Sequence, residues 1–129
     1  MSLNVVREYY LIIKNKIKHC YFETAILNID KLLSVYPKDE HAYYFKGLCK
    51  FALNDYRNAI INYNTAIKLN PAYAKAYFNL GVTFYVIKDY DKALINIAKA
   101  LIIFEKRKEL DKKQRAIDAL NLIKKERGA

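Results

Sequence analysis

The sequence predicts an all-α fold, an α-solenoid of three antiparallel helix pairs with a terminal capping helix. Two observations favour this fold class. Residue types recur at a fixed spacing of 34 residues, in three successive copies. The 129-residue chain holds only 3 glycines and 2 prolines, a composition that favours helices over β-structure and disorder. A period of this length is typical of stacked repeats, in which each unit packs on its neighbours.

The 34-residue spacing places residues of the same kind in matched columns. The columns are Ala25, Ala59 and Ala93; Tyr9, Tyr43 and Tyr77; Tyr10, Tyr44 and Phe78; Phe22, Tyr56 and Tyr90; and Pro37 with Pro71. They define repeats at about residues 6–39, 40–73 and 74–107 of a single domain that covers residues 1–129.

Each repeat is predicted to contain two helices. The first helices are expected at Asn4–Lys18, Glu40–Ala52 and Ala74–Ile87, and the second helices at Phe22–Val35, Tyr56–Leu69 and Tyr90–Phe104. Pro37 and Pro71 separate the repeats, because proline cannot continue a helix and disfavours helical backbone in the residue before it. Asp39, Asp55 and Asp89 precede helical runs and are expected to cap them.

Small residues in the helices indicate where backbones come close together. Gly47 and Gly81 lie in the middle of first helices, where glycine costs about 1 kcal/mol relative to alanine. A neighbouring helix that packs closely explains this choice, and Ala59 and Ala93 supply matching small surfaces on the second helices. The first repeat differs, since Ile13 occupies the glycine position.

The repeat phase is lost after Phe104. Glu105 stands where a third proline would fall, so the helix is expected to continue to about Lys108. A further helix is predicted at about residues 111–127, and its apolar stripe consists of Ala116, Ile117, Leu120 and Ile123. Stacks of repeats need a final helix with a polar outer face, so we interpret this segment as the capping helix. A basic arm for nucleic acid or membrane is less favoured, because nine basic residues are interspersed with five acidic ones between Glu105 and Arg127.

Composition limits the partners and the compartment. A net charge of +10 favours anionic partners in general without choosing among acidic peptides, nucleic acid and anionic lipid. The first residues lack the pattern of a signal peptide, and the longest apolar run, Ala100–Phe104, is far shorter than the ~20 residues of a membrane span. Cys20 and Cys49 are expected to be reduced thiols of a cytoplasmic protein, with Cys49 in the core.

The sequence favours a protein that is not an enzyme and has no cofactor and no metal. The three glycines are isolated, so no phosphate-binding loop is present, and neither serine has a histidine nearby in the sequence. His41 and Cys49 lie eight residues apart on one predicted helix, too far to share a metal ion.

The segment from Tyr77 to Phe84, followed by Tyr90, Ala93 and Ala100, resembles the pattern of the tetratricopeptide repeat (TPR) family. Residues 40–71 are similar to it as well, with Lys46 and Lys50 in place of the usual apolar and aromatic residues. The resemblance covers about residues 6–104. It implies a TPR superhelix whose first helices line a concave groove that holds a peptide or a helix of a partner.

Carried over by matched position, the resemblance implies a groove lined by residues of all three first helices. These residues are Arg7, Tyr10, Lys14, His41, Tyr44, Phe45, Leu48, Phe51, Lys75, Phe78, Asn79, Val82 and Tyr85. The helical period supports a shared face, because Tyr44, Leu48 and Phe51 follow the spacing i, i+4, i+7. The same spacing also suits core positions, so both interpretations of these aromatics stay open.

One subset of the family binds chaperone C-termini through a clamp of lysine, asparagine and arginine side chains. Here Tyr10, Lys14, Phe45 and Asn79 occupy four of the clamp positions with other residue types, and only Lys75 matches. We therefore do not expect this mode of recognition, since the charged donors that grip two carboxylates are missing.

The resulting expectation is a non-catalytic protein-protein interaction module, or adaptor, that binds a partner segment with apolar anchors and some acidic residues. One alternative is a small bacterial secretion-type co-chaperone that holds an apolar substrate. A second alternative is a basic repeat protein associated with nucleic acid, and self-association also stays open.

Overall fold

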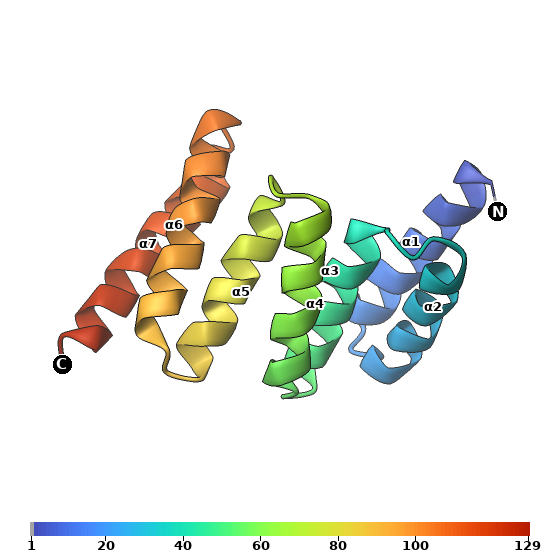
Figure 1. Ribbon diagram of the computed structural model, residues 1–129, viewed down its shortest axis with the longest axis horizontal. Coiled ribbons are helices and arrows are strands. Elements are labelled where there is room, and N and C mark those ends of the chain that lie inside the picture. Colours follow the sequence, from blue (N-terminus) through green and yellow to red (C-terminus); the bar gives the residue numbers. More distant parts are fainter. Residues whose placement is uncertain (1) are drawn as a thin grey trace. The chain divides into compact units, whose positions relative to one another are not determined.

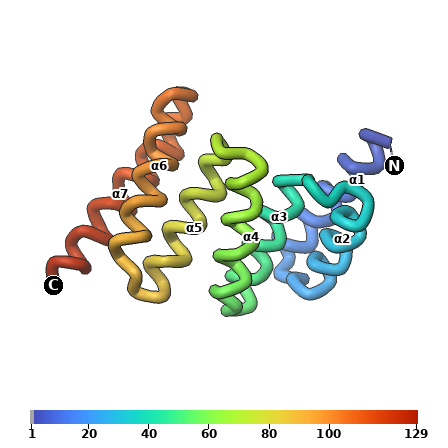
Figure 2. The backbone as a smooth tube through the Cα atoms, in the orientation of Figure 1, coloured from blue at the N-terminus to red at the C-terminus, as the bar shows by residue number. Residues whose placement is uncertain are grey.

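The computed structural model describes residues 2–129, and these residues form seven α-helices and no strand (Figure 1). The helices are α1 (Leu3–Lys18), α2 (Phe22–Val35), α3 (Glu40–Ala52), α4 (Tyr56–Leu69), α5 (Ala74–Val86), α6 (Tyr90–Lys106) and α7 (Leu110–Arg127). They form two compact units, one ending at Leu69 and the other beginning at Asn70. In each unit the chain runs back and forth through successive antiparallel helices (Figure 2). The predicted all-α solenoid fold is confirmed.

The predicted helix boundaries agree with the structure for α2, α3 and α4 and differ slightly elsewhere. α1 begins at Leu3 rather than Asn4. α5 ends at Val86 rather than Ile87, α6 ends at Lys106 rather than Lys108, and α7 begins at Leu110. α6 stops earlier than expected because Lys108 has a positive φ of 56°, a conformation that a right-handed helix cannot contain.

The turn inside each repeat has the same geometry in all three repeats. Cys20, Asn54 and Lys88 lie 34 residues apart and have φ values of 64°, 63° and 68°. In the third repeat, Asp89 N–H donates to the Phe84 carbonyl oxygen (2.8 Å) and Lys88 N–H to that of Tyr85 (3.0 Å). These two bonds define a Schellman motif, and the other two turns repeat them. A fourth turn of this kind joins α6 to α7, and Lys108 is its residue with positive φ.

Glycine at two of these positions is expected to stabilise the protein. A side chain at positive φ costs roughly 1–2 kcal/mol, whereas glycine adopts this conformation freely but loses more entropy on folding. We expect Lys88→Gly and Lys108→Gly each to raise the free energy of unfolding in urea by about 0.5–1 kcal/mol. Asn54→Gly is the comparison, because asparagine tolerates this conformation and its gain is expected to be smaller. A loss of stability in Lys88→Gly contradicts the assigned turn.

The three predicted aspartate caps are present. Asp39 Oδ1 accepts the N–H of Ala42 at 3.1 Å, and Asp55 Oδ1 accepts that of Asn58 at 3.3 Å. Asp89 Oδ1 accepts the N–H of Lys92, also at 3.3 Å. Each carboxylate thus satisfies a backbone donor that the first turn of a helix leaves free.

In the first unit, Gly47 lets α3 pack directly on an aromatic ring of α4. A Cβ atom added to Gly47 would lie 2.5 Å from Cε1 and 2.6 Å from Cδ1 of Tyr63, well inside van der Waals contact. Tyr63 is almost fully buried, and so is Ala59 on the same helix. The close approach predicted from the small residues is therefore confirmed here.

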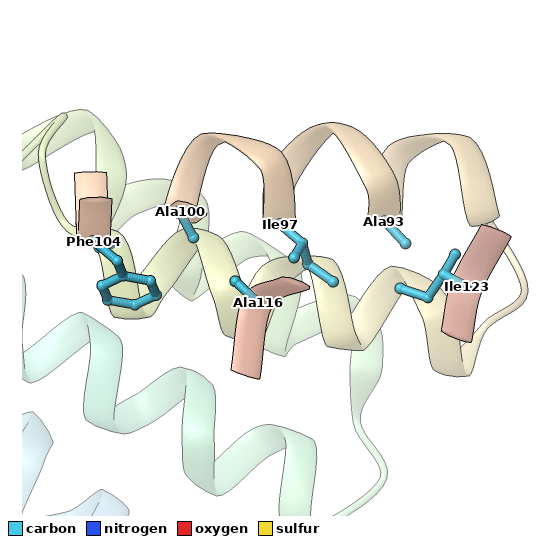
Figure 3. Close-up of a cluster of buried hydrophobic side chains, with 7 residues drawn as sticks. Ala93, Ile97, Ala100, Phe104, Ala116 and Ile123 are labelled. Atoms are coloured by element: carbon cyan, nitrogen blue, oxygen red, sulfur yellow. The ribbon is translucent and has the colours of Figure 1, made fainter. Parts of the chain in front are cut away.

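The second unit has the same arrangement, with α7 added to it. A Cβ atom at Gly81 would overlap Cγ1 of Ile97 and lie 3.0 Å from the carbonyl oxygen of Ala93. Figure 3 shows the buried side chains of α6 meeting two residues of α7. The labelled residues are Ala93, Ile97, Ala100 and Phe104 of α6, with Ala116 and Ile123 of α7. α7 thus covers the open side of this core.

The two cysteines differ in their surroundings. Cys49 is fully buried, as the sequence predicts, and Cys20 is exposed. Burial raises the pKa of the Cys49 thiol to about 11, while nearby Lys50 acts in the opposite direction. Cys49 is therefore an inert core residue.

Candidate partner-binding surface

In the first unit, Tyr10 of α1 connects the two first helices. Its hydroxyl donates a hydrogen bond to Oδ2 of Asp39, the residue that also caps α3. Its ring meets the rings of His41 and Phe45 edge-on, with centroids 5.8 and 6.0 Å apart. Burial and the Asp39 carboxylate both raise the pKa of Tyr10, so its hydroxyl stays protonated and keeps donating.

Basic side chains lie beside this aromatic cluster. The Lys14 ammonium is 6.0 Å from the centroid of the Phe45 ring, within the range of a cation–π contact. Arg7, Lys14 and His41 are all exposed. We call the set Arg7, Tyr10, Lys14, His41 and Phe45 the α1–α3 surface. Phe45 is only 7 % exposed, so the accessible ring area of this surface comes from half-buried Tyr10 and exposed His41, beside the positive charges of Arg7 and Lys14.

Of the other predicted residues of α3, Tyr44 and Phe51 contact α4. Tyr44 is only 9 % exposed, and its ring lies 6.0 Å from that of Tyr63, so it faces the packing of α3 on α4. Leu48 and Phe51 are half-buried, and the Phe51 ring meets that of Tyr56 at 5.4 Å. The regular spacing of these three residues therefore does not give them equal access to solvent.

In the second unit the predicted residues lie along α5. Lys75 is exposed, whereas Phe78, Asn79, Val82 and Tyr85 are half-buried. Asn79 Nδ2 donates to the Lys75 carbonyl oxygen at 3.0 Å. Phe78 also packs against the hydrophobic core of this unit. Only part of each of these side chains is available to a partner.

α7 makes contacts with α5 and α6 that the sequence does not predict. The Tyr85 hydroxyl donates to Oε1 of Glu126 at 2.8 Å, and this bond raises the pKa of Tyr85. Arg127 Nη1 lies 3.3 Å from Oδ1 of Asp91. Glu126 lies outside the 34-residue pattern, so no repeat column identifies it. The end of α7 therefore borders the predicted α5 residues.

Residues 2–129 contain no group of three or more His, Cys, Asp or Glu side chains placed to hold a metal ion. Within the same described range, no helix combines the length and the apolar character needed to cross a membrane.

Comparison with protein families confirms the resemblance seen in the sequence. The model of the TPR repeat matches residues 47–86, which run from α3 through α4 to the end of α5. No curated protein gives a significant sequence match. The sequence of residues 47–86 is thus similar to the tetratricopeptide repeat.

Solved structures show the same fold. The type III secretion translocator chaperone SycD of Yersinia enterocolitica is similar with a TM-score of 0.91 at 17 % identity, covering 100 % of this chain and 90 % of that one. PcrH, known from Pseudomonas aeruginosa, is similar in its complex with the chaperone-binding region of PopD, with a TM-score of 0.90 at 16 % identity. That match covers 98 % of this chain and 96 % of PcrH.

The TPR2B domain of yeast Sti1, solved in a complex with pHsp70, is similar with a TM-score of 0.86 at 18 % identity. The match covers 93 % of this chain and 96 % of that domain. At these identities the likeness establishes the fold, which is that of the tetratricopeptide repeat proteins.

Proposed function

We propose that the chain is a non-catalytic adaptor that binds a segment of another protein on the exposed sides of its first helices. The observation that carries the proposal is the α1–α3 surface, where the half-buried Tyr10 ring meets the exposed His41 ring and the exposed Lys14 ammonium lies over the buried Phe45 ring. The structural relatives support it, because SycD was solved with a peptide of YopD and PcrH with the chaperone-binding region of PopD. We further propose that the chain acts in the cytoplasm.

The chemistry of the surface indicates the kind of segment that fits. Aromatic rings favour apolar anchors, and the neighbouring cations favour carboxylates between those anchors. Each buried anchor contributes roughly 1.5–3 kcal/mol, from which the ordering of the segment must be subtracted. Two or three anchors therefore give an affinity on the order of micromolar. The charges mainly speed the encounter and select acidic partners.

Charge reversal at exposed positions tests this proposal with little risk to the fold. The variant Arg7→Glu/Lys14→Glu/Lys75→Glu changes three exposed side chains of the first helices. We expect it to lose at least nine-tenths of the proteins that the immobilised wild-type chain retains from a native extract, as quantified by mass spectrometry. The reason is that the new carboxylates repel an acidic segment.

The matched control is Lys31→Glu/Lys68→Glu, which reverses two exposed charges on second helices. It is expected to retain the same proteins as the wild type, and circular dichroism should show the same helicity for all three proteins. If the first-helix variant retains the same proteins in the same amounts, the binding surface lies elsewhere.

A second candidate function is that of a secretion-type co-chaperone that holds one apolar substrate. The likeness to SycD and PcrH over nearly the whole of all three chains favours it. It predicts that the chain, purified from its native cells, carries one apolar protein in a constant ratio, and that this protein aggregates when the chain is deleted. An adaptor instead carries partners that stay soluble without it.

A further inference from the structure

We propose that the outer face of α6 is a second docking surface, which binds an acidic amphipathic helix of a partner. Five residues follow one another along α6 at spacings of three, four, three and four residues, and we call them the α6 ridge: Lys92, Ile95, Lys99, Ile102 and Lys106. This alternation is the 3.5-residue period of a coiled-coil seam, in which one helix packs along another. In the ridge, cations alternate with isoleucines.

The isoleucines of the ridge lie outside the buried core of their own unit. Ile95 and Ile102 are 54 % and 53 % exposed. The opposite face of α6 carries the buried residues Ala93, Ile97, Ala100 and Phe104, which pack within the core (Figure 3). α6 therefore has one apolar seam that is already filled and a second row of isoleucines that remains open.

The lysines border the isoleucines and leave them accessible. The ammonium group of Lys92 lies 5.6 Å from the centroid of the Phe84 ring, and that of Lys99 lies 5.8 Å from the centroid of the Tyr77 ring. Both rings belong to α5, so the two cations lean toward α5. The result is an apolar strip with a positively charged margin on one side.

Ion pairs with α7 leave this strip with an excess of positive charge. On the other flank, Asp91 pairs with Arg127 at 3.3 Å and Glu105 pairs with Lys113 at 3.5 Å. Among the ridge lysines, Lys92 pairs with Asp89 at 3.7 Å. Within residues 2–129, neither Lys99 nor Lys106 belongs to an ion pair. The carboxylates beside the ridge are thus engaged, and two of its cations are open to a partner.

Charge and spacing together select the occupant. A second copy of this chain would bring one row of lysines against another, and like charges across a seam are destabilising. An anionic membrane would satisfy the charge, but it has no requirement for a 3.5-residue repeat. A helix with apolar a and d positions and glutamates beside them matches both the positive charge and the 3.5-residue spacing of the ridge. The ridge spans 14 residue steps, about 21 Å, which matches two heptads of such a helix.

A pair of synthetic helices provides the probe. Both peptides have 21 residues with leucine at a and d, and they differ only in carrying glutamate or lysine at the flanking e and g positions. Binding to the full chain is measured by fluorescence anisotropy of the labelled peptide. We expect the glutamate peptide to bind at least tenfold more tightly than the lysine peptide, with an affinity that falls as salt is added.

Exposed substitutions then locate the binding site. Ile95→Gln/Ile102→Gln is expected to lower the affinity for the glutamate peptide at least tenfold. Lys99→Glu/Lys106→Glu is expected to lower it at least fivefold. The matched control is Ile61→Gln, because Ile61 has the same repeat position as Ile95 and is 52 % exposed, but the residue seven positions later is Lys68. It should bind like the wild type, so a loss of binding that is confined to the ridge variants locates the site on α6.

Three results overturn the inference. The first is that the glutamate peptide does not bind the wild-type chain. The second is that the peptide binds both ridge variants as tightly as it binds the wild-type chain. The third is that the peptide does not bind, whereas vesicles of phosphatidylserine and phosphatidylcholine bind the wild-type chain and do not bind Ile95→Gln/Ile102→Gln. This result would assign the ridge to membrane binding.

Discussion

The variant Gly47→Ala is expected to lower the free energy of unfolding by about 2 kcal/mol. Alanine is the better helix former by about 1 kcal/mol, so helix propensity alone predicts the opposite sign. The loss arises because the new methyl group would lie 2.5 Å from the ring of buried Tyr63, so α3 and α4 must move apart. Urea unfolding followed by circular dichroism measures the effect.

A double-mutant cycle separates this contact from other causes. In a Tyr63→Ala background the clashing ring atoms are absent, so Gly47→Ala is expected to become neutral or to stabilise by up to ~1 kcal/mol. Gly128→Ala is the matched control, because the nearest atoms to its Cβ lie at ordinary distances of 3.5 and 3.7 Å, and we expect a change below ~0.5 kcal/mol. Additive effects of Gly47→Ala and Tyr63→Ala would contradict close packing at this point.

Ile97→Ala is expected to have the largest effect in the second unit, a loss of about 3–4 kcal/mol. Ile97 is fully buried and lies directly over Gly81, so truncation leaves a cavity between α5 and α6. Urea unfolding gives the total loss, and faster amide hydrogen exchange should appear in α6.

The control for this variant is two residues away on the same helix. Ile95 is 54 % exposed, so Ile95→Ala should change the free energy of unfolding by less than ~0.5 kcal/mol. Equal losses in Ile95→Ala and Ile97→Ala would mean that the two faces of α6 are assigned wrongly.

Most of the fold could be predicted because its determinants are local and repeated. Glycine and alanine at fixed positions mark the close contacts, and aspartates before the helices mark their caps. The turn geometry could not be predicted in the same way. Cys20, Asn54 and Lys88 share a positive φ but no residue type, and the glycine that usually marks such a position is absent. The predicted end of α6 at about Lys108 was wrong for the same reason, because Lys108 also has a positive φ without being glycine.

The candidate surface was less predictable, because it depends on contacts between residues distant in sequence. Matched position placed Tyr10 among the candidates, but only the structure shows that its hydroxyl is bonded to Asp39. Tyr44 and Tyr10 fall in one sequence column, yet Tyr44 is 9 % exposed and turns toward Tyr63. A helical period identifies an apolar face, but the neighbouring helix decides which side chains that face buries.

Site-specific photo-crosslinking shows whether the first helices bind a partner segment. A benzophenone amino acid is placed singly at Lys14, Lys75, Lys31 or Lys68, all of which are exposed. Each protein is irradiated together with a partner recovered with the wild-type chain. Binding by the first helices predicts adducts from positions 14 and 75 and none from positions 31 and 68 on the second helices. Adducts from positions 31 and 68 alone would contradict it.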